Sequence, residues 1–172
     1  MPAQSASVPG KGIHHATSGP DHGRCRGGAG YVGSHACVAL IESGYLPLVL
    51  DNFSNSSIES LRRVGRITGV QPRLVEADVR DASALDSVFR GGTIDAVMHF
   101  AGLKAVGEST AQPLRYYAHN LAGTVALAEA MQRTGVRNLV FSSSATVYGE
   151  PGIEQLQEDM RCDPVNPFGR TK

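Results

Sequence analysis

A glycine-rich turn followed by a helical pattern constrains this chain more than any other feature of its sequence. Gly27, Gly30 and Gly33 stand directly before a segment of helically spaced apolar residues that stops at Gly44. Glycines in such a turn permit a tight bend, a close approach of backbone to a pyrophosphate, and close packing of helix against strand. The helix start then offers N–H groups and a positive dipole end to phosphates. The turn therefore predicts a dinucleotide site.

Asp51 strengthens this prediction through its distance from the turn. It lies 18 residues after Gly33, at the end of the next apolar run. A carboxylate at this point accepts hydrogen bonds from ribose hydroxyls and disfavours a 2′-phosphate, so the spacing favours NAD over NADP. The alternative is an ordinary helix cap followed by an ordinary loop aspartate.

Short apolar strands alternate with helices along the rest of the chain. Expected helices run from the glycine turn to Gly44, from Ser56 to about Arg66, and over residues 83–89 and 113–134. Expected strands end at Asp51 and cover residues 73–77, 94–100 and 137–143, and loop is expected beyond Tyr148. This alternation indicates crossover units, and thus an α/β fold with a Rossmann-like, doubly wound parallel sheet.

Composition excludes several classes of protein. The 172 residues correspond to about one domain. Sixteen basic residues balance sixteen acidic ones, which argues against a nucleic-acid partner or an anionic membrane surface. No apolar stretch approaches the ~18 residues that span a bilayer. The cysteines are odd in number and widely spaced, which suits free thiols in a reducing compartment, so we expect a cytoplasmic protein.

Residues 1–26 differ from the rest of the chain. They contain Pro, Ser, Gly and three of the six histidines, with almost no apolar periodicity and no secretory signal pattern. A transit peptide is an alternative, although arginine is sparse. The histidines and the cysteine here match no compact zinc module, so no metal site is expected. We expect a disordered or non-native tail over residues 1–26 and a partial dinucleotide-binding domain over residues 27–172.

Five segments together resemble the UDP-glucose 4-epimerases of the extended short-chain dehydrogenase/reductase family. They are RGGAGYVGSH (26–35), DNFSNSS (51–57), HFAGLKAVGES (99–109), FSSSATVYG (141–149) and NPFGRTK (166–172). The segments occur in the family's order and cover nearly all of residues 27–172.

The resemblance implies a set of site residues and a reaction. Residues implied to contact NAD are Gly27, Gly30, Tyr31, Val32, Gly33, Asp51, Asn52, Phe53, Ser54, Asn55, Ser56, Asp78, Val79, Phe100, Ala101, Gly102, Leu103, Lys104, Asn120 and Lys172. Ser144 and Thr146 are implied to meet the sugar of a UDP-sugar substrate, and Ser144, Phe168 and Lys172 occupy the family's catalytic positions. The implied chemistry oxidises the C4 hydroxyl by hydride transfer to NAD and returns the hydride to the other face. A homodimer is implied for the intact enzyme.

Asn120 is a poor helix former in the middle of an expected helix. On its own it would be a surface residue. Together with the segments above, it is expected to organise the loops around the cofactor.

Three departures from the family pattern qualify these expectations. Glycines and a proline precede the glycine turn where the family has an apolar strand, so the first strand is expected to be missing. Phe168 stands at the catalytic tyrosine position, which removes the hydroxyl. The chain stops at Lys172, so the C-terminal substrate domain is expected to be absent. The alternatives are therefore an epimerase for another nucleotide sugar or a non-catalytic NAD-binding pseudoenzyme module.

Overall fold

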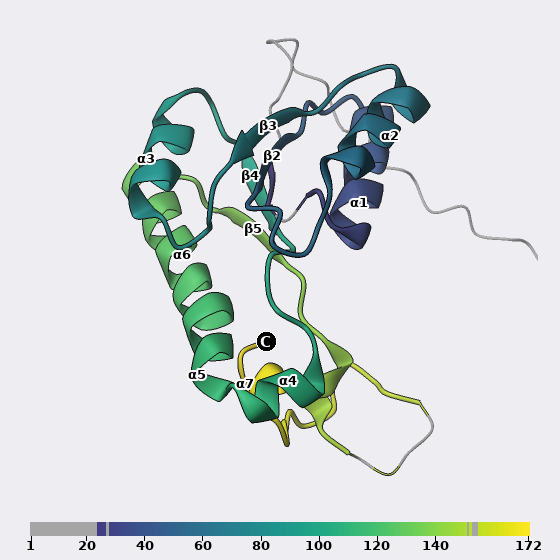
Figure 1. Ribbon diagram of the computed structural model, residues 1–172, viewed down its shortest axis with the longest axis vertical. Helices are drawn as coiled ribbons and strands as arrows, with labels where there is room; N and C mark the ends of the chain where they lie inside the picture. The colour runs from purple at the N-terminus through teal and green to yellow at the C-terminus, as the bar shows by residue number, and fades with distance from the viewer. Residues whose placement is uncertain (1–23, 27, 151, 153–154) are drawn as a thin grey trace, which may run out of the picture.

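Five parallel strands form one twisted sheet (Figure 1). The computed structural model describes residues 24–26, 28–150, 152 and 155–172. The strands are β1 (Arg24–Arg26), β2 (Leu48–Asp51), β3 (Arg73–Glu76), β4 (Ala96–His99) and β5 (Asn138–Phe141). Their order is β3-β2-β1-β4-β5, which is the order of the first five strands in a doubly wound sheet. The predicted α/β class with a Rossmann-like parallel sheet is therefore confirmed.

The prediction that the first strand is missing is wrong. Arg24–Arg26 forms β1, in which Cys25 pairs with Val49 of β2 on one side and with Met98 of β4 on the other. A ladder needs an extended backbone with free N–H and C=O groups, and the two flanking strands present matching groups to these three residues. Arg24–Arg26 therefore forms a strand despite its unfavourable composition. Of the tail expected over residues 1–26, residues 24–26 belong to β1, and residues 1–23, like Gly27, lie outside the described residues.

Two helical layers bury the sheet. Helices α1 (Tyr31–Glu42) and α2 (Ile58–Thr68) lie on one side, and α3 (Ala82–Arg90) and α6 (Ala122–Thr134) on the other (Figure 1). Val49 packs with the cluster that includes Cys37 and Leu61, whereas Leu50 packs with Leu85 and Leu127. Adjacent residues of β2 join different clusters because successive side chains of a strand point to opposite faces. The sheet is thus the middle layer of three, with the core divided between its two faces.

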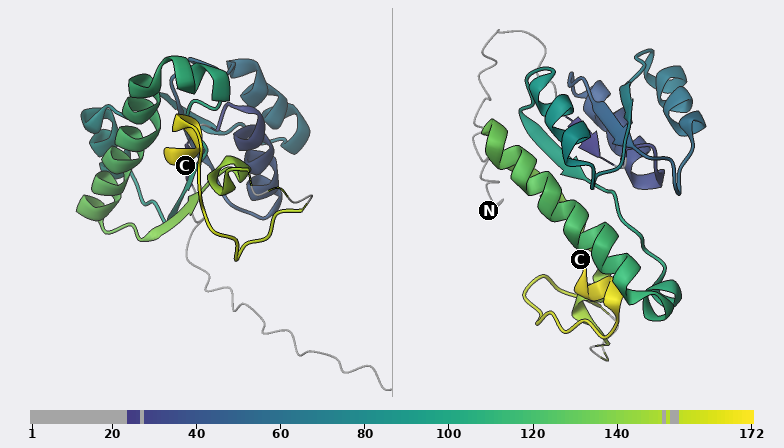
Figure 2. Two further views of the ribbon diagram at one scale, coloured as in Figure 1. Left: turned by 90° about the horizontal axis from the view of Figure 1, so that it is seen from below. Right: turned by 60° about the vertical axis from the view of Figure 1, so that its left-hand side comes forward.

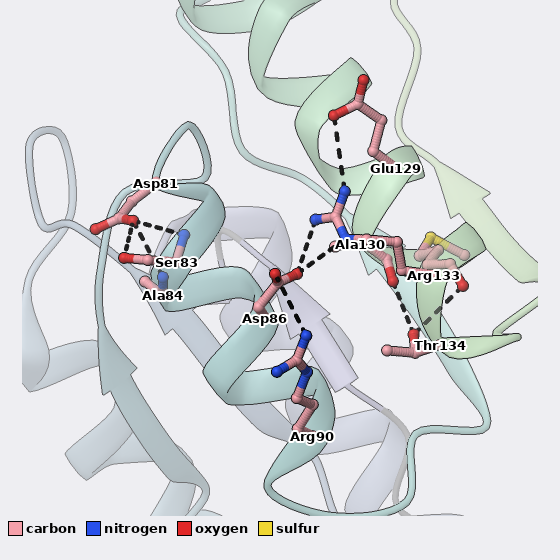
Figure 3. Close-up of polar contacts among 10 residues, drawn as sticks. Asp81, Ser83, Ala84, Asp86, Arg90, Glu129, Ala130, Arg133 and Thr134 are labelled. Carbon is pink, nitrogen blue, oxygen red and sulfur yellow. Dashed lines mark hydrogen bonds and ion pairs between the residues drawn. The ribbon is translucent and has the colours of Figure 1, made fainter.

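Polar contacts join α3 to α6 on the outside of this core (Figure 3). Asp81 caps α3, since its Oδ1 accepts hydrogen bonds from the N–H groups of Ser83 and Ala84 at 2.9 and 3.0 Å. Arg133 of α6 reaches across to Asp86 of α3, with Nη2 2.7 Å from Oδ1. This partly exposed ion pair links the two helices and adds little to stability.

The helix expected over 113–134 is divided into three parts. It consists of α5 (Pro113–Tyr116), a π-helical turn η1 (Tyr117–Leu121) and α6. It begins beside the C-terminal part of the chain and runs back alongside the sheet (Figure 2). Three short elements that were not predicted lie near its beginning: α4 (Val106–Ala111), α7 (Pro167–Arg170) and the 3₁₀ turn η2 (Ala145–Tyr148). Within the described residues, no helix is long and apolar enough to cross a membrane.

The N-cap of α2 lies one residue after Ser56, where the sequence predicted the helix to start. Ser57 is the N-cap, and its Oγ accepts the Glu59 N–H at 3.3 Å. The Ser56 hydroxyl instead donates to Asp51 at 2.7 Å. Both serines suit an N-cap, and the contact with Asp51 decides between them.

Candidate functional site

A cleft of about 320 Å³ opens at the carboxyl ends of the strands. In open α/β sheets, ligands bind at this edge, where the strand order reverses. Its lining consists of Gly30, Tyr31, Val32, Gly33, Leu50, Asp51, Asn52, Ser54, Asn55, Ser56, Ala77, Asp78, Val79, Phe100, Ala101, Gly102, Leu103, Lys104, His119, Ser142, Ser143, Ser144, Phe168 and Lys172. Most of the predicted site residues are therefore brought together around one cavity.

The first turn of α1 forms one wall of the cleft. Gly30 is the N-cap of this helix, and Tyr31 and Val32 are exposed at its first turn. First-turn N–H groups have no partner within the helix, so they suit an anion. No acidic side chain lies in this turn to compete for them.

Asp51 ties the glycine turn to the loop that follows β2. Its Oδ2 accepts the Ala29 N–H at 3.1 Å, while Oδ1 accepts the Phe53 N–H at 3.0 Å and the Ser56 hydroxyl. An ionised carboxylate has about four lone-pair sites, so these bonds leave capacity for one more donor. Asp51 can therefore shape the loops and also accept a hydrogen bond from a ribose hydroxyl.

Asp78 makes a second carboxylate-centred contact, between the loops after β2 and β3. Arg80 binds it through Nε and Nη2 at 2.9 and 2.8 Å, and Asn52 Nδ2 donates to Oδ2 at 2.9 Å. Hydrogen bonds from Arg80 hold the pKa of the Asp78 carboxyl well below its usual range. Asp78 is therefore ionised at neutral pH and keeps these two loops together.

Lys172 lies at the opposite end of the cleft. Its Nζ donates to the Ser142 carbonyl at 3.1 Å and stands 5.1 Å from the centre of the Phe141 ring. Burial lowers the pKa of this ammonium. A cation held here suits ribose hydroxyls, which accept hydrogen bonds from it.

Ser144 and Phe168 share this end of the cleft with Lys172. The Thr146 hydroxyl donates to Ser144 Oγ at 2.9 Å. Phe168 is 6% exposed and meets the Tyr116 ring edge-on, with centroids 6.4 Å apart. The three expected catalytic positions thus converge, although Phe168 brings no titratable group.

Tyr116 is fully buried and lies outside the cleft lining. Its hydroxyl is 2.8 Å from both the Ala105 carbonyl and Glu108 Oε2 and accepts the Ala105 N–H at 3.0 Å. Burial raises the pKa of the Tyr116 phenol. Tyr116 therefore stays protonated and does not replace the hydroxyl that Phe168 lacks.

Three predicted site residues lie behind the lining. Phe53 packs against the core cluster of α1 and α2, Thr146 supports Ser144, and Asn120 is buried beneath Leu103. Each of them is hydrogen-bonded to a residue that lines the cleft: Phe53 to Asp51, Thr146 to Ser144 and Asn120 to Leu103. Asn120 links to the loop after β4 by bonds to both the N–H and the carbonyl of Leu103, as its expected organising role requires.

Sequence reasoning missed five lining residues: Leu50, Ala77, His119, Ser142 and Ser143. Four of them lie at or just beyond the carboxyl ends of β2, β3 and β5, so strand position was an available signal. His119 had no such signal, since it lies on η1; its Nδ1 is 2.9 Å from the Arg115 carbonyl.

The residues present fit a dinucleotide. One end of the cleft offers helix N–H groups and Asp51, and the other offers Lys172 beside Ser144. Between them Gly102 has a φ of +156°, and a Cβ there would stand 3.2 Å from Lys172 Nζ. The absence of a side chain at Gly102 therefore keeps the middle of the cleft open.

The fold and this cleft define a dinucleotide-binding α/β protein. A family model described as "NAD dependent epimerase/dehydratase family" matches residues 26–172. The chain belongs to this family, whose cofactor is NAD.

Similar proteins share about half their length with this chain. A UDP-glucose 4-epimerase of Bacillus subtilis is 58% identical over 146 residues, which are 85% of this chain and 43% of the relative. A UDP-glucose 4-epimerase structure from Stenotrophomonas maltophila, with bound NAD and formylated UDP-arabinopyranose, has a TM-score of 0.85 and 46% identity. One from Bifidobacterium longum, with NAD+ and UDP, has a TM-score of 0.85 and 42% identity. These matches cover 88% of this chain and 45% of each solved chain.

Proposed function

We propose that this chain is the NAD-binding part of a UDP-glucose 4-epimerase, the enzyme class that interconverts UDP-glucose and UDP-galactose. The observation that carries the proposal is the cleft, which brings the α1 N-terminus, Asp51, Ser144 and Lys172 around one cavity. The 58% identity to the Bacillus subtilis epimerase supports the choice of reaction.

The chain's own residues have distinct parts in this proposal. NAD, when bound, would accept and return the hydride at C4 of the sugar. The first turn of α1 would bind the pyrophosphate, and Asp51 would accept a ribose hydroxyl hydrogen bond. Lys172 would bind the nicotinamide ribose, and Ser144, supported by Thr146, would hydrogen-bond the C4 hydroxyl of the sugar.

Phe168 favours a second candidate function, a non-catalytic NAD-binding module. The proposed reaction removes a proton from the C4 hydroxyl, and a phenyl ring cannot accept one. The hydroxyls of Ser144 and Thr146 are too weakly acidic to replace a phenolate. We therefore propose that this chain binds NAD with its catalytic step impaired.

The partner and compartment are also proposals. Leu114, Leu121 and Val125 are 82, 48 and 49% exposed on α5, η1 and α6, which supports a helix-to-helix homodimer. Cys162 is an exposed free cysteine, as a reducing cytoplasm would keep it.

Incubation with NAD and UDP-galactose separates the two candidate functions. The purified chain is given both, and UDP-glucose is measured while NAD binding is followed by the shift in melting temperature. We expect NAD, and not NADP, to raise the melting temperature, because ligands that bind the folded state stabilise it. We expect no UDP-glucose. Formation of UDP-glucose would contradict the proposal that the catalytic step is impaired. Equal shifts of the melting temperature with NAD and NADP would contradict the role of Asp51 in favouring NAD.

A further inference from the structure

Asn120 joins three parts of the chain beneath the cleft. It lies in the π-helical turn η1 and is buried. Its Oδ1 accepts the Leu103 N–H at 2.8 Å, and its Nδ2 donates to the Leu103 carbonyl at 2.9 Å and to Thr171 Oγ1 at 3.0 Å. Because a backbone N–H can only donate, Leu103 fixes which end of the amide faces it. Both amide hydrogens then have partners, and one of them is committed to Thr171.

Thr171 connects this amide to the helix that carries Phe168. Its buried hydroxyl accepts from Asn120 and donates to the Phe168 carbonyl at 2.9 Å. Helix α7 has only four residues, so it has few hydrogen bonds of its own to hold it in place. The Thr171 hydroxyl therefore anchors the end of α7 to η1, one residue before Lys172.

The Lys172 ammonium and the Asn120 amide approach the same glycine. A Cβ on Gly102 would stand 3.0 Å from Asn120 Oδ1 and 3.2 Å from Lys172 Nζ. The two side chains therefore enclose one backbone position of the cleft wall. A displacement of α7 relative to η1 would move the ammonium relative to this wall.

The backbone of Asn120 is held as well as its side chain. The Thr124 hydroxyl donates to the Asn120 carbonyl at 2.6 Å and lies 3.1 Å from His99 Nε2. A hydroxyl has one hydrogen, and a carbonyl only accepts, so His99 Nε2 is the donor toward Thr124. The hydrogen-bonded chain thus runs from β4 through η1 to α7.

We propose that Thr171 is a positioning residue for Lys172: its hydroxyl sets the distance between α7 and Asn120, and through it the place of the Lys172 ammonium in the cleft. The consequence for binding a nicotinamide dinucleotide rests on the proposed function. The place of the ammonium is a property of the chain alone, and it can be measured without ligand.

Three variants test the proposal. Thr171→Val keeps the side-chain shape and removes the hydroxyl, whereas Thr171→Ser retains the hydroxyl. Thr134→Val is the matched control, since the Thr134 hydroxyl donates to the Ala130 carbonyl at 2.8 Å at the far end of α6. Lys11, Lys104 and Lys172 are the only lysines in the chain, so isotope-labelled lysine gives three signals whose titration NMR can follow.

Thr171→Val is expected to raise the pKa of Lys172 toward the ordinary lysine value, because the ammonium is no longer held in its buried place. The same variant should weaken NAD binding about tenfold. Thr171→Ser and Thr134→Val should leave both quantities unchanged. If Thr171→Val does not fold, Thr171→Ala removes the same hydroxyl with a smaller side chain, and the same two shifts are expected.

Unchanged Lys172 titration in both Thr171→Val and Thr171→Ala would overturn the proposal, as would equal shifts in Thr134→Val. If the titration moves while the unmodified chain shows no NAD binding, the positioning role stands and the proposed function fails.

Discussion

Two carboxylates of the cleft wall, Asp51 and Asp78, organise the loops around them. Asp51 accepts three hydrogen bonds from the glycine turn and the loop after β2. Asp78 accepts hydrogen bonds from Arg80 and Asn52. Gly102 completes this arrangement by leaving space where a side chain would meet Asn120 and Lys172. The shape of the cleft therefore depends on a few residues, each of which contacts more than one of the neighbouring loops.

Gly102→Ala should destabilise the protein and weaken NAD binding. The new Cβ would stand 3.0 Å from Asn120 Oδ1 on a backbone with φ of +156°, so we expect a loss of about 1–3 kcal/mol in the free energy of unfolding. Gly107→Ala is the control, because nothing lies within 4 Å of its Cβ position and alanine favours helix α4. Urea unfolding and NAD titration measure both effects. Equal stability of the two variants would contradict the crowding at Gly102.

Asp78 should make stability fall in acid. Its pKa is lower in the folded chain than in the unfolded one, so its contribution is present above the unfolded pKa and is lost as pH falls below it. Asp78→Asn should therefore lose less stability than the wild type between about pH 6 and pH 3. Urea midpoints at the two pH values measure the difference. The exposed Asp159→Asn serves as control, and a wild-type-like loss in Asp78→Asn would contradict the assignment.

Among the helices and strands, the sequence predicted those whose formation is determined by a local pattern of residues. The glycine turn, α1, β2 and Asp51 follow from spacing along the chain and occur as expected. The strand β1 was missed because its pairing partners, β2 and β4, are distant in sequence. The π-helical turn was also missed, because helical periodicity alone does not show that Asn120 bonds to Leu103 and Thr171.

Strand β1 can be tested through its middle residue. Cys25 pairs with strands on both sides, so proline there removes a ladder hydrogen bond in the centre of the sheet. We expect Cys25→Pro to abolish cooperative thermal unfolding followed by circular dichroism. Cys25→Val should unfold cooperatively, because a β-branched residue suits a central strand. A cooperative, wild-type-like transition in Cys25→Pro would show that β1 does not hold the sheet together.

On the scale of the whole molecule, the chain spans less than half the length of the relatives it matches. A chimera can supply the rest: residues 26–172 replace the matching part of the Bacillus subtilis epimerase. With Phe168 in this chimera we expect little turnover of UDP-galactose. Phe168→Tyr should raise the turnover number by at least about a hundredfold, since general-base assistance is worth ~10²–10⁴ in rate. NAD affinity should change little, because Lys172 is retained.

The matching control in the chimera is Phe141→Tyr, which adds a hydroxyl to another aromatic ring near Lys172. It should leave turnover low. If the chimera with Phe168 turns over UDP-galactose as fast as its Phe168→Tyr variant does, another group serves as the base.

Calorimetric titration of the chain with NAD tests the central claim most directly, namely that the cleft at the carboxyl ends of the strands holds this cofactor. We expect saturable binding of one NAD per chain and weaker binding of NADP. Affinity should fall about tenfold or more in both Asp51→Asn and Lys172→Met, which change opposite ends of the cleft. Absence of saturable heat, or the same affinity in both variants as in the wild type, would contradict it.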